Sequence, residues 1–235
     1  MRSPFAPAHR RPVGPALAVL LLTAALGIRG PVPKALADDD SSPAGIVQPM
    51  MADSSQVPCA PGTTSLGVER GFNQGQAVDI HLCAIPNLTA AHSAEESTPG
   101  SNHYIEGAQQ HAVVNARISG AALAMVDAAR ADGVTLLATS SFRTERQQKD
   151  LYQCYVDQKP GCLQAADPGY SNHQMGLAID FALPQSYDTC DGGAARDDPS
   201  WKWLKENAAD FGFRQMETEN WHWDTSVDGG FPMCD

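Results

Sequence analysis

The sequence predicts an α+β fold in which helices pack on a small, mainly antiparallel β-sheet. An alanine-rich segment, residues 113–131, has larger apolar residues spaced among small ones, as in a helix that packs closely on a sheet. Short apolar runs, each preceded by a glycine, are typical of buried strands and occur at residues 134–139 and 177–181, and residues 213–216 are a further strand candidate. We expect the loops at the sheet ends to line a cleft.

The N-terminal segment predicts export. Several arginines precede a short apolar run, residues 16–28, and Ala35-Leu36-Ala37 is typical of a cleavage site. The run is too short for a good spanning helix, which needs about 20 apolar residues. Residues 1–37 are therefore interpreted as a signal peptide, which places the mature chain outside the cytoplasm or in the cell envelope. An uncleaved membrane anchor is the alternative.

The mature chain would be strongly acidic. Residues 1–37 hold five basic residues and no acidic ones, so their removal leaves 11 basic and 27 acidic residues, a net charge of −16. This charge argues against binding to nucleic acid or anionic membranes through bulk electrostatics. We expect a flexible leader at 38–58, an N-terminal disulfide-bearing extension at 59–112 and the main domain at 113–235, in a monomeric protein.

All six cysteines lie in the mature part, and an even number in an exported chain indicates disulfides. Sequence order suggests the pairs Cys59–Cys83, Cys154–Cys162 and Cys190–Cys234, although other connectivities are open. The last pair would tie the C-terminus to the loop that follows the strand at 177–181.

The stretch Ser171-Asn172-His173-Gln174-Met175-Gly176 leads into an apolar run that Asp180 interrupts. A carboxylate inside an apolar strand is costly unless it is paired or bound to a metal. His173 and Asp180 can therefore be two ligands of one cation. A solvated histidine beside a capping aspartate is the alternative.

A third ligand would be His222, which stands between two tryptophans. Two histidines and one carboxylate suit Zn²⁺, and three protein ligands leave a fourth position for water, as in catalytic sites. Glu219, three residues earlier, can be the general base that deprotonates this water. Glu217 is the rival for that role.

Residues 140–148 follow the predicted strand at 134–139 and lead into a helix that Thr144 and Gln147 can begin as a capping box. Arg143 lies at the strand–helix turn, where its planar guanidinium could bind a carboxylate with two hydrogen bonds. The alternative is a surface arginine at a helix start, where the helix dipole mildly disfavours a cation.

Together these motifs resemble the zinc D-alanyl-D-alanine carboxypeptidases of the VanY type, part of a group that includes other D-Ala-D-Ala metallopeptidases and the hedgehog signalling domain. The family patterns Ser-x-His-x-x-Gly-x-Ala-x-Asp and Glu-x-Trp-His begin here at Ser171 and Glu219. The third, Ser-Gly-Tyr-Arg-Ser-x-x-x-Gln, is similar to residues 140–148. The resemblance covers roughly residues 113–224. Asn220 departs from it, because the family commonly has proline there, and we expect a looser loop.

The resemblance implies a hedgehog-like fold and a zinc-dependent D,D-carboxypeptidase that removes the terminal D-Ala from peptidoglycan stem peptides. Zn²⁺ would be held by His173, Asp180 and His222, with Glu219 as the catalytic base.

The resemblance also implies that Arg143 takes part in catalysis by holding the substrate's terminal carboxylate. Gln148 would be a nearby polar contact and Ser171 a further residue of the substrate site. Two alternatives stay open: a peptidoglycan endopeptidase of the same zinc group, and a non-catalytic, metal-stabilised module that binds the cell wall. The presence of Glu219 weighs against the second.

Overall fold

The computed structural model describes residues 53–90, 111–187, 189–225 and 232–234. All of them lie within one compact unit, Pro43–Asp235. The predicted signal peptide and most of the predicted leader fall outside the described residues. Within the described part, no helix is long and apolar enough to cross a membrane.

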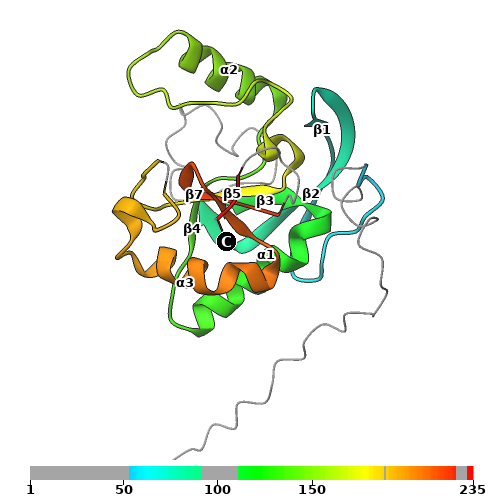
Figure 1. Ribbon diagram of the computed structural model, residues 1–235. Helices are drawn as coiled ribbons and strands as arrows, with labels where there is room; N and C mark the ends of the chain where they lie inside the picture. The colour runs from blue at the N-terminus through cyan, green and yellow to red at the C-terminus, as the bar shows by residue number, and fades with distance from the viewer. Residues whose placement is uncertain (1–52, 91–110, 188, 226–231, 235) are drawn as a thin grey trace, which may run out of the picture. The chain divides into compact units, whose positions relative to one another are not determined.

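One mixed, mainly antiparallel sheet organises the described residues (Figure 1). Its strands follow the order β1-β2-β4-β5-β7-β6, and β3 pairs with β2. Their bounds are β1 Thr64–Asn73, β2 Gln76–Ala90, β3 His111–Asn115, β4 Leu137–Ser140, β5 Ala178–Phe181, β6 Arg214–Met216 and β7 Glu219–Asp224. Only the short β2–β4 pairing is parallel. The predicted fold class is confirmed.

Within the described ranges, three α-helices flank the sheet: α1 Ala116–Ala131, α2 Glu145–Val156 and α3 Pro199–Asn207. Short 3₁₀ turns, η3 Asn172–Met175, η4 Gly193–Ala195 and η5 Ala208–Phe211, complete the elements. In Figure 1, α1 and α3 lie together beside the sheet, joined by a hydrogen bond from Trp203 Nε1 to Asp132 Oδ2 of 2.9 Å. The α2 helix lies on another side.

The first helix begins later than the sequence predicts. Residues 111–115 form β3 and pair with β2, so the expected helix from Val113 is wrong over its first three residues. Val113 and Val114 are fully buried, and β-branched side chains pack well on a pleated surface. Asn115 then starts α1, because its side-chain oxygen accepts a hydrogen bond from the Arg117 amide.

The hydrophobic core lies where α1 and α3 meet the sheet. Small side chains, among them the fully buried Ala122 and Ala129, let α1 approach the strands closely, as its composition predicts. From α3, Trp201 and Leu204 point into the same core. The capping box that opens α2 at Thr144 is confirmed in both of its hydrogen bonds.

All three suggested disulfides are present: Cys59–Cys83, Cys154–Cys162 and Cys190–Cys234. The first ties the segment before β1 to β2, and the last ties the C-terminal residues to the loop before α3.

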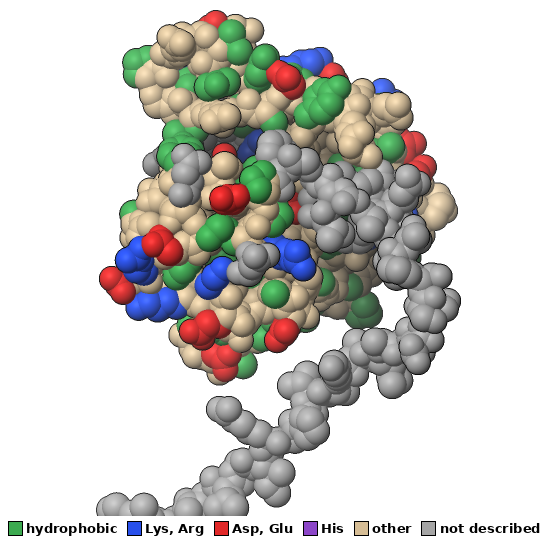
Figure 2. Space-filling model, in the orientation of Figure 1, with side chains coloured by type: hydrophobic (Ala, Val, Ile, Leu, Met, Phe, Trp, Pro, Cys, Tyr) green, Lys and Arg blue, Asp and Glu red, His purple; other side chains and the backbone are tan. Residues whose placement is uncertain are grey.

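β1 and β2 belong to the same sheet as β4–β7, while the predicted boundary between extension and main domain stays a prediction. On the face drawn in Figure 2, acidic and basic side chains lie close together. Lys202 Nζ and Asp197 Oδ1 form an exposed ion pair at 3.1 Å.

Candidate metal centre and active site

The sheet register brings the candidate ligands together. On the central strand β5, Asp180 lies opposite His222 of β7 on one side and opposite Ser140 of β4 on the other. Directly opposite residues of antiparallel strands present their side chains on the same face. The third candidate, His173, comes from η3, which two residues, Gly176 and Leu177, connect to β5.

The turn that carries His173 is fixed to the start of α1. Gly176 ends η3 in the left-handed conformation, at φ 67°. Its carbonyl accepts a hydrogen bond of 2.9 Å from the Asn115 amide, and the Asn115 side chain donates to the Met175 carbonyl at 3.1 Å. A side chain at position 176 would lie 2.8 Å from the Asn115 nitrogen, so this close approach requires glycine.

Three ligand atoms converge in a buried site. The distances are 3.2 Å from His173 Nε2 to Asp180 Oδ1, 3.1 Å from His173 Nε2 to His222 Nδ1 and 3.0 Å from His222 Nδ1 to Asp180 Oδ1. Tetrahedral ligands at zinc bond lengths of about 2.0–2.1 Å are separated by about 3.3 Å. The three side chains therefore have the spacing of ligands around one ion and could hold a metal.

Outer hydrogen bonds orient both imidazoles. His173 Nδ1 lies 2.7 Å from the Ser141 carbonyl, so this nitrogen carries the hydrogen and Nε2 turns its lone pair towards the site. His222 Nε2 faces Asp224 Oδ2 at 3.4 Å, which leaves Nδ1 turned inward. Asn172 fixes that carboxylate with a hydrogen bond of 2.6 Å. Two inward lone pairs only 3.1 Å apart need a proton or a cation between them.

Sequence reasoning missed both Asp224 and Asn172. The sequence does contain a signal for Asp224. Side chains alternate between the two faces of a strand, so residues 222 and 224 share one face of β7. Asp224 is nevertheless a common residue type at a strand end, and only the fold brings Asn172 to it.

The electrostatics of the site favour a bound cation. Burial lowers the pKa of His173. Burial would raise the pKa of Asp180, but the neighbouring His173 and His222 hold it well below its usual range. Burial would also lower the pKa of His222, but hydrogen bonds to Asp180 and Asp224 raise it to about 10. Without a metal, the positive charge between these carboxylates is thus a proton on His222, which a divalent cation can replace.

Arg143 lies beside this centre, and its backbone amide donates to the His173 carbonyl at 3.0 Å. Its Nη1 donates to Gln148 Oε1 at 2.8 Å, and its Nη2 lies 3.8 Å from Asp180 Oδ2. Burial lowers the pKa of Arg143, and the charges of Asp180 and Glu219 oppose this shift. Its Nε is buried without a hydrogen-bond partner among the described residues.

Gln148 and Ser171 are both buried. Both ends of the Gln148 amide are used, because Oε1 accepts from Arg143 and Nε2 donates to the Ala166 carbonyl at 2.7 Å. The Ser171 side chain does not cap η3, and its carbonyl accepts from the Gln174 amide.

The two carboxylates considered as the base lie in different surroundings. Glu219 opens β7 and is half-buried, and burial raises its pKa against the opposing influence of His222. The charges of Asp180 and Arg143 also act on it. Glu217 is exposed in the turn between β6 and β7. Glu219, on the same strand as His222, is thus the carboxylate on which the charges of the candidate ligands act.

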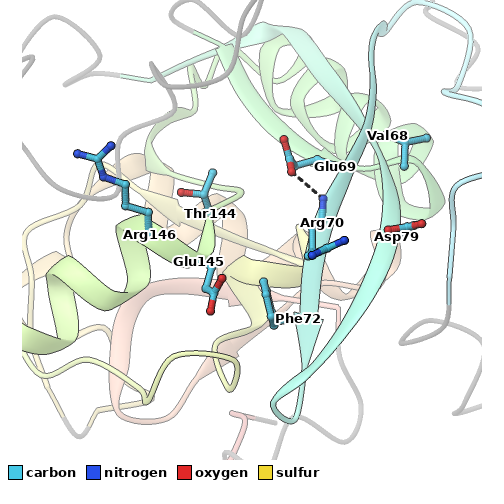
Figure 3. Close-up of a pocket in the computed structure, with 8 residues that line it drawn as sticks. All are labelled: Val68, Glu69, Arg70, Phe72, Asp79, Thr144, Glu145 and Arg146. Atoms are coloured by element: carbon cyan, nitrogen blue, oxygen red, sulfur yellow. Dashed lines mark hydrogen bonds between the residues drawn. The ribbon is translucent and has the colours of Figure 1, made fainter.

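A separate groove of about 460 Å³ runs between β1 and the start of α2 (Figure 3). Arg70 and Phe72 line it from β1, and Glu145 and Arg146 line it from α2. None of the three candidate ligands lines it, so this groove is separate from the candidate metal centre.

Residues 111–225 match the family model of VanY, D-alanyl-D-alanine carboxypeptidase. A D-alanyl-D-alanine carboxypeptidase of Enterococcus faecalis is 33% identical over 112 residues, which are 43% of this chain and 39% of that protein. These matches confirm the resemblance to VanY-type carboxypeptidases that the motifs indicate. The chain spans only 39% and 41% of the length of two curated relatives.

Two solved structures are also similar. VanYB in complex with D-alanine-D-alanine is 26% identical, with 59% of this chain and 84% of that chain covered and a TM-score of 0.39. A mutant of the vancomycin resistance D,D-pentapeptidase VanY in complex with Zn(II) is 29% identical, with 48% and 72% covered and a TM-score of 0.37.

We predict that Gly176→Ala destabilises the protein more than a matched change in open space. Gly133 has a similar positive φ of 80° but nothing within 4 Å of a new side chain, so Gly133→Ala measures backbone strain alone. We expect a loss of about 1 kcal/mol in the free energy of unfolding for Gly133→Ala and about 2–3 kcal/mol for Gly176→Ala. Urea unfolding in the presence of a chelator measures both. Equal losses would mean that contact with Asn115 does not hold the turn.

Proposed function

We propose that this chain is a zinc-dependent peptidoglycan D,D-carboxypeptidase that removes the terminal D-Ala from stem peptides ending in D-Ala-D-Ala. The observation that carries the proposal is the buried cluster of His173, Asp180 and His222, whose inward atoms lie 3.0–3.2 Å apart beside a half-buried glutamate and a partly buried arginine. The match of residues 111–225 to the VanY family model supports the same reaction.

His173, Asp180 and His222 would hold Zn²⁺. The donor set fits this ion, because two neutral imidazoles and one carboxylate are common zinc ligands and leave a position open. When bound, the ion would act as a Lewis acid that polarises the scissile carbonyl and lowers the pKa of a water molecule bound to it. Asp224 and the Ser141 carbonyl keep the imidazoles in the tautomers that metal binding requires.

Glu219 would act as general base and then as general acid. Its carboxylate accepts a proton from the water that attacks the scissile carbonyl, and it returns this proton to the nitrogen of the leaving D-Ala as the peptide C–N bond breaks. Burial raises the pKa of Glu219, which helps one carboxyl group both to accept and to donate a proton near neutral pH.

Arg143 would bind the terminal carboxylate of the substrate. Its buried Nε has no described partner, and an unsatisfied donor beside the site is available to a ligand. Gln148, with both ends of its amide engaged, acts by fixing the orientation of Arg143. Ser171 supports the turn that carries His173, at the edge of the substrate site.

The enzyme would act outside the cytoplasm, where its peptidoglycan substrate lies. Three disulfides, Cys59–Cys83, Cys154–Cys162 and Cys190–Cys234, support this location, because such bonds persist in oxidising compartments. Cleavage near Ala37 stays a prediction.

We predict that each chain binds one zinc ion tightly at this site. We expect His222→Ala and Asp180→Ala to abolish zinc binding, and Asp224→Ala to weaken it about 10–100-fold through loss of the outer hydrogen bond. Isothermal titration calorimetry on protein dialysed against a chelator measures each affinity. His81→Ala is the matched control, because His81 bonds to the Val57 carbonyl away from the cluster. Full affinity in His222→Ala would rule out this ligand set.

Glu219→Gln is expected to keep zinc and lose hydrolysis, with kcat lower by about 10²–10⁴-fold, because a glutamine cannot accept the proton. Mass spectrometry of a pentapeptide stem ending in D-Ala-D-Ala, after incubation with zinc-loaded protein, measures release of one D-Ala. Glu217→Gln changes an exposed carboxylate in the turn just before β7 and should be as active as the unaltered protein. Undiminished activity of Glu219→Gln would rule out Glu219 as the base. Cleavage of cross-linked fragments by the unaltered protein, without release of D-Ala from the pentapeptide, would indicate an endopeptidase.

Arg143→Ala should remove the preference for a free C-terminus. We expect kcat/KM for the free peptide to fall about 10–100-fold, the effect of losing hydrogen bonds to a charged group, while an amidated peptide loses much less. Competition between the two peptides measures the ratio directly. Arg146→Ala changes a largely exposed arginine nearby and should preserve the ratio. Equal losses on both peptides would exclude carboxylate recognition by Arg143.

A further inference from the structure

Tyr187 lies beside the proposed base, in a position to which the motifs assign no role. It forms an antiparallel bridge with Glu219, and its ring meets the Trp221 ring edge to face at a centroid distance of 5.0 Å. Trp221 is buried, whereas Tyr187 is 45% exposed. The ring of Tyr187 is therefore held on one edge by the core and open to solvent on the other.

The loop that carries Tyr187 is held by Asn220, which is fully buried next to Glu219. Asn220 Oδ1 accepts from the Ser186 amide at 2.9 Å, and its Nδ2 donates to the carbonyls of Pro184 and Gly192 at 3.0 and 2.7 Å. One side chain thus binds three backbone groups on both sides of Tyr187. Asn220 itself lies in strand β7, and the expected loosening of the loop at this motif stays a prediction.

Further contacts fix the same loop. The Ser186 hydroxyl accepts a hydrogen bond from the Ala194 amide at 2.7 Å, and Cys190 is bonded to Cys234. A side chain at Gly192 would lie 2.7 Å from the Trp201 ring, so the loop packs directly on α3. Tyr187 is therefore presented to solvent from a rigid support.

The surroundings of Tyr187 suit contact with a peptide. Burial, and then the charge of Glu219, raise the pKa of Tyr187, so its hydroxyl stays a neutral hydrogen-bond donor near neutral pH. Tyrosine offers a large amphipathic contact area at little cost in conformational entropy, since only two side-chain angles must be fixed. A tyrosine already fixed by its support loses still less on binding.

We propose that Tyr187 contacts the substrate on the side of Glu219, with Asn220 as its positioning residue. The ring packs on the D-Ala-D-Ala end of the peptide, and the hydroxyl donates to a peptide carbonyl. This inference rests on the proposed carboxypeptidase function and names a residue that binds its substrate.

The test is steady-state kinetics of the zinc-loaded mature chain on a stem pentapeptide ending in D-Ala-D-Ala. Tyr187→Ala should raise KM about tenfold and leave kcat within about twofold, because it removes binding that is equal in the ground and transition states. Tyr187→Phe should raise KM less, since it removes only the hydroxyl. Tyr155→Ala changes another exposed tyrosine, on α2, and should leave both constants unchanged.

Asn220→Ala should raise KM in the same direction, because the loop loses three hydrogen bonds. In a double-mutant cycle, adding Tyr187→Ala to Asn220→Ala should have little further effect, since both act through one ring. Circular dichroism and zinc content check that each variant is folded. If Asn220→Ala does not fold, Ser186→Ala loosens the loop through the lost bond to Ala194.

An unchanged KM in Tyr187→Ala, with an active unaltered protein, would overturn the substrate contact and leave the proposed function standing. Additive effects in the cycle would overturn the positioning role of Asn220. A zinc-loaded protein that cleaves no stem peptide at all would overturn the proposed function and this inference together.

Discussion

The buried pairing of Asp180 with His222 across β5 and β7 is the constraint on which the rest of the site depends. Taking a carboxylate out of water costs several kcal/mol unless an opposite charge or hydrogen bonds compensate. Asp180 is only 8% exposed and obtains this compensation from two imidazoles and, more distantly, from Arg143. Because β5 lies between β4 and β7, the register of two strand pairings decides which side chains face Asp180.

The surrounding structure holds the three candidate ligands in place through contacts of its own. Asn115 both begins α1 and holds the turn of His173, so the first helix and the site share one residue. Asp224, itself held by Asn172, faces the outer nitrogen of His222. Ligands whose tautomers and rotamers are already selected lose little entropy on binding, which is the advantage of a site built on strands rather than on a free loop.

The sequence predicts the parts of this site that depend on residue type and local spacing. His173, Asp180, His222 and Glu219 are recognisable from their residue types and spacings together with the family patterns that they match, and the Thr144 capping box follows from a short-range rule. The cysteine pairs follow from sequence order, although two of them join residues 24 and 44 positions apart. It does not predict what depends on partners far along the chain. Residues 113–115 look helical beside the alanine-rich segment, yet pairing with β2 makes them a strand. Asp224 and Asn172 are ordinary polar residues until the fold brings them together.

Asn220 departs from the family motif, and its effect depends on the contacts that the side chain makes at this position rather than on its residue type alone. Proline would stiffen the chain through its fixed φ, at the cost of a backbone donor. Asparagine stiffens it through three side-chain hydrogen bonds, and its backbone amide also reaches the Ser186 carbonyl at 3.3 Å. A buried amide is costly unless its donors and acceptor are satisfied, so Asn220 and the loop it binds depend on each other. The rigidity of the strand that carries Glu219 is thereby extended to a neighbouring loop, which a proline at this position could not hold.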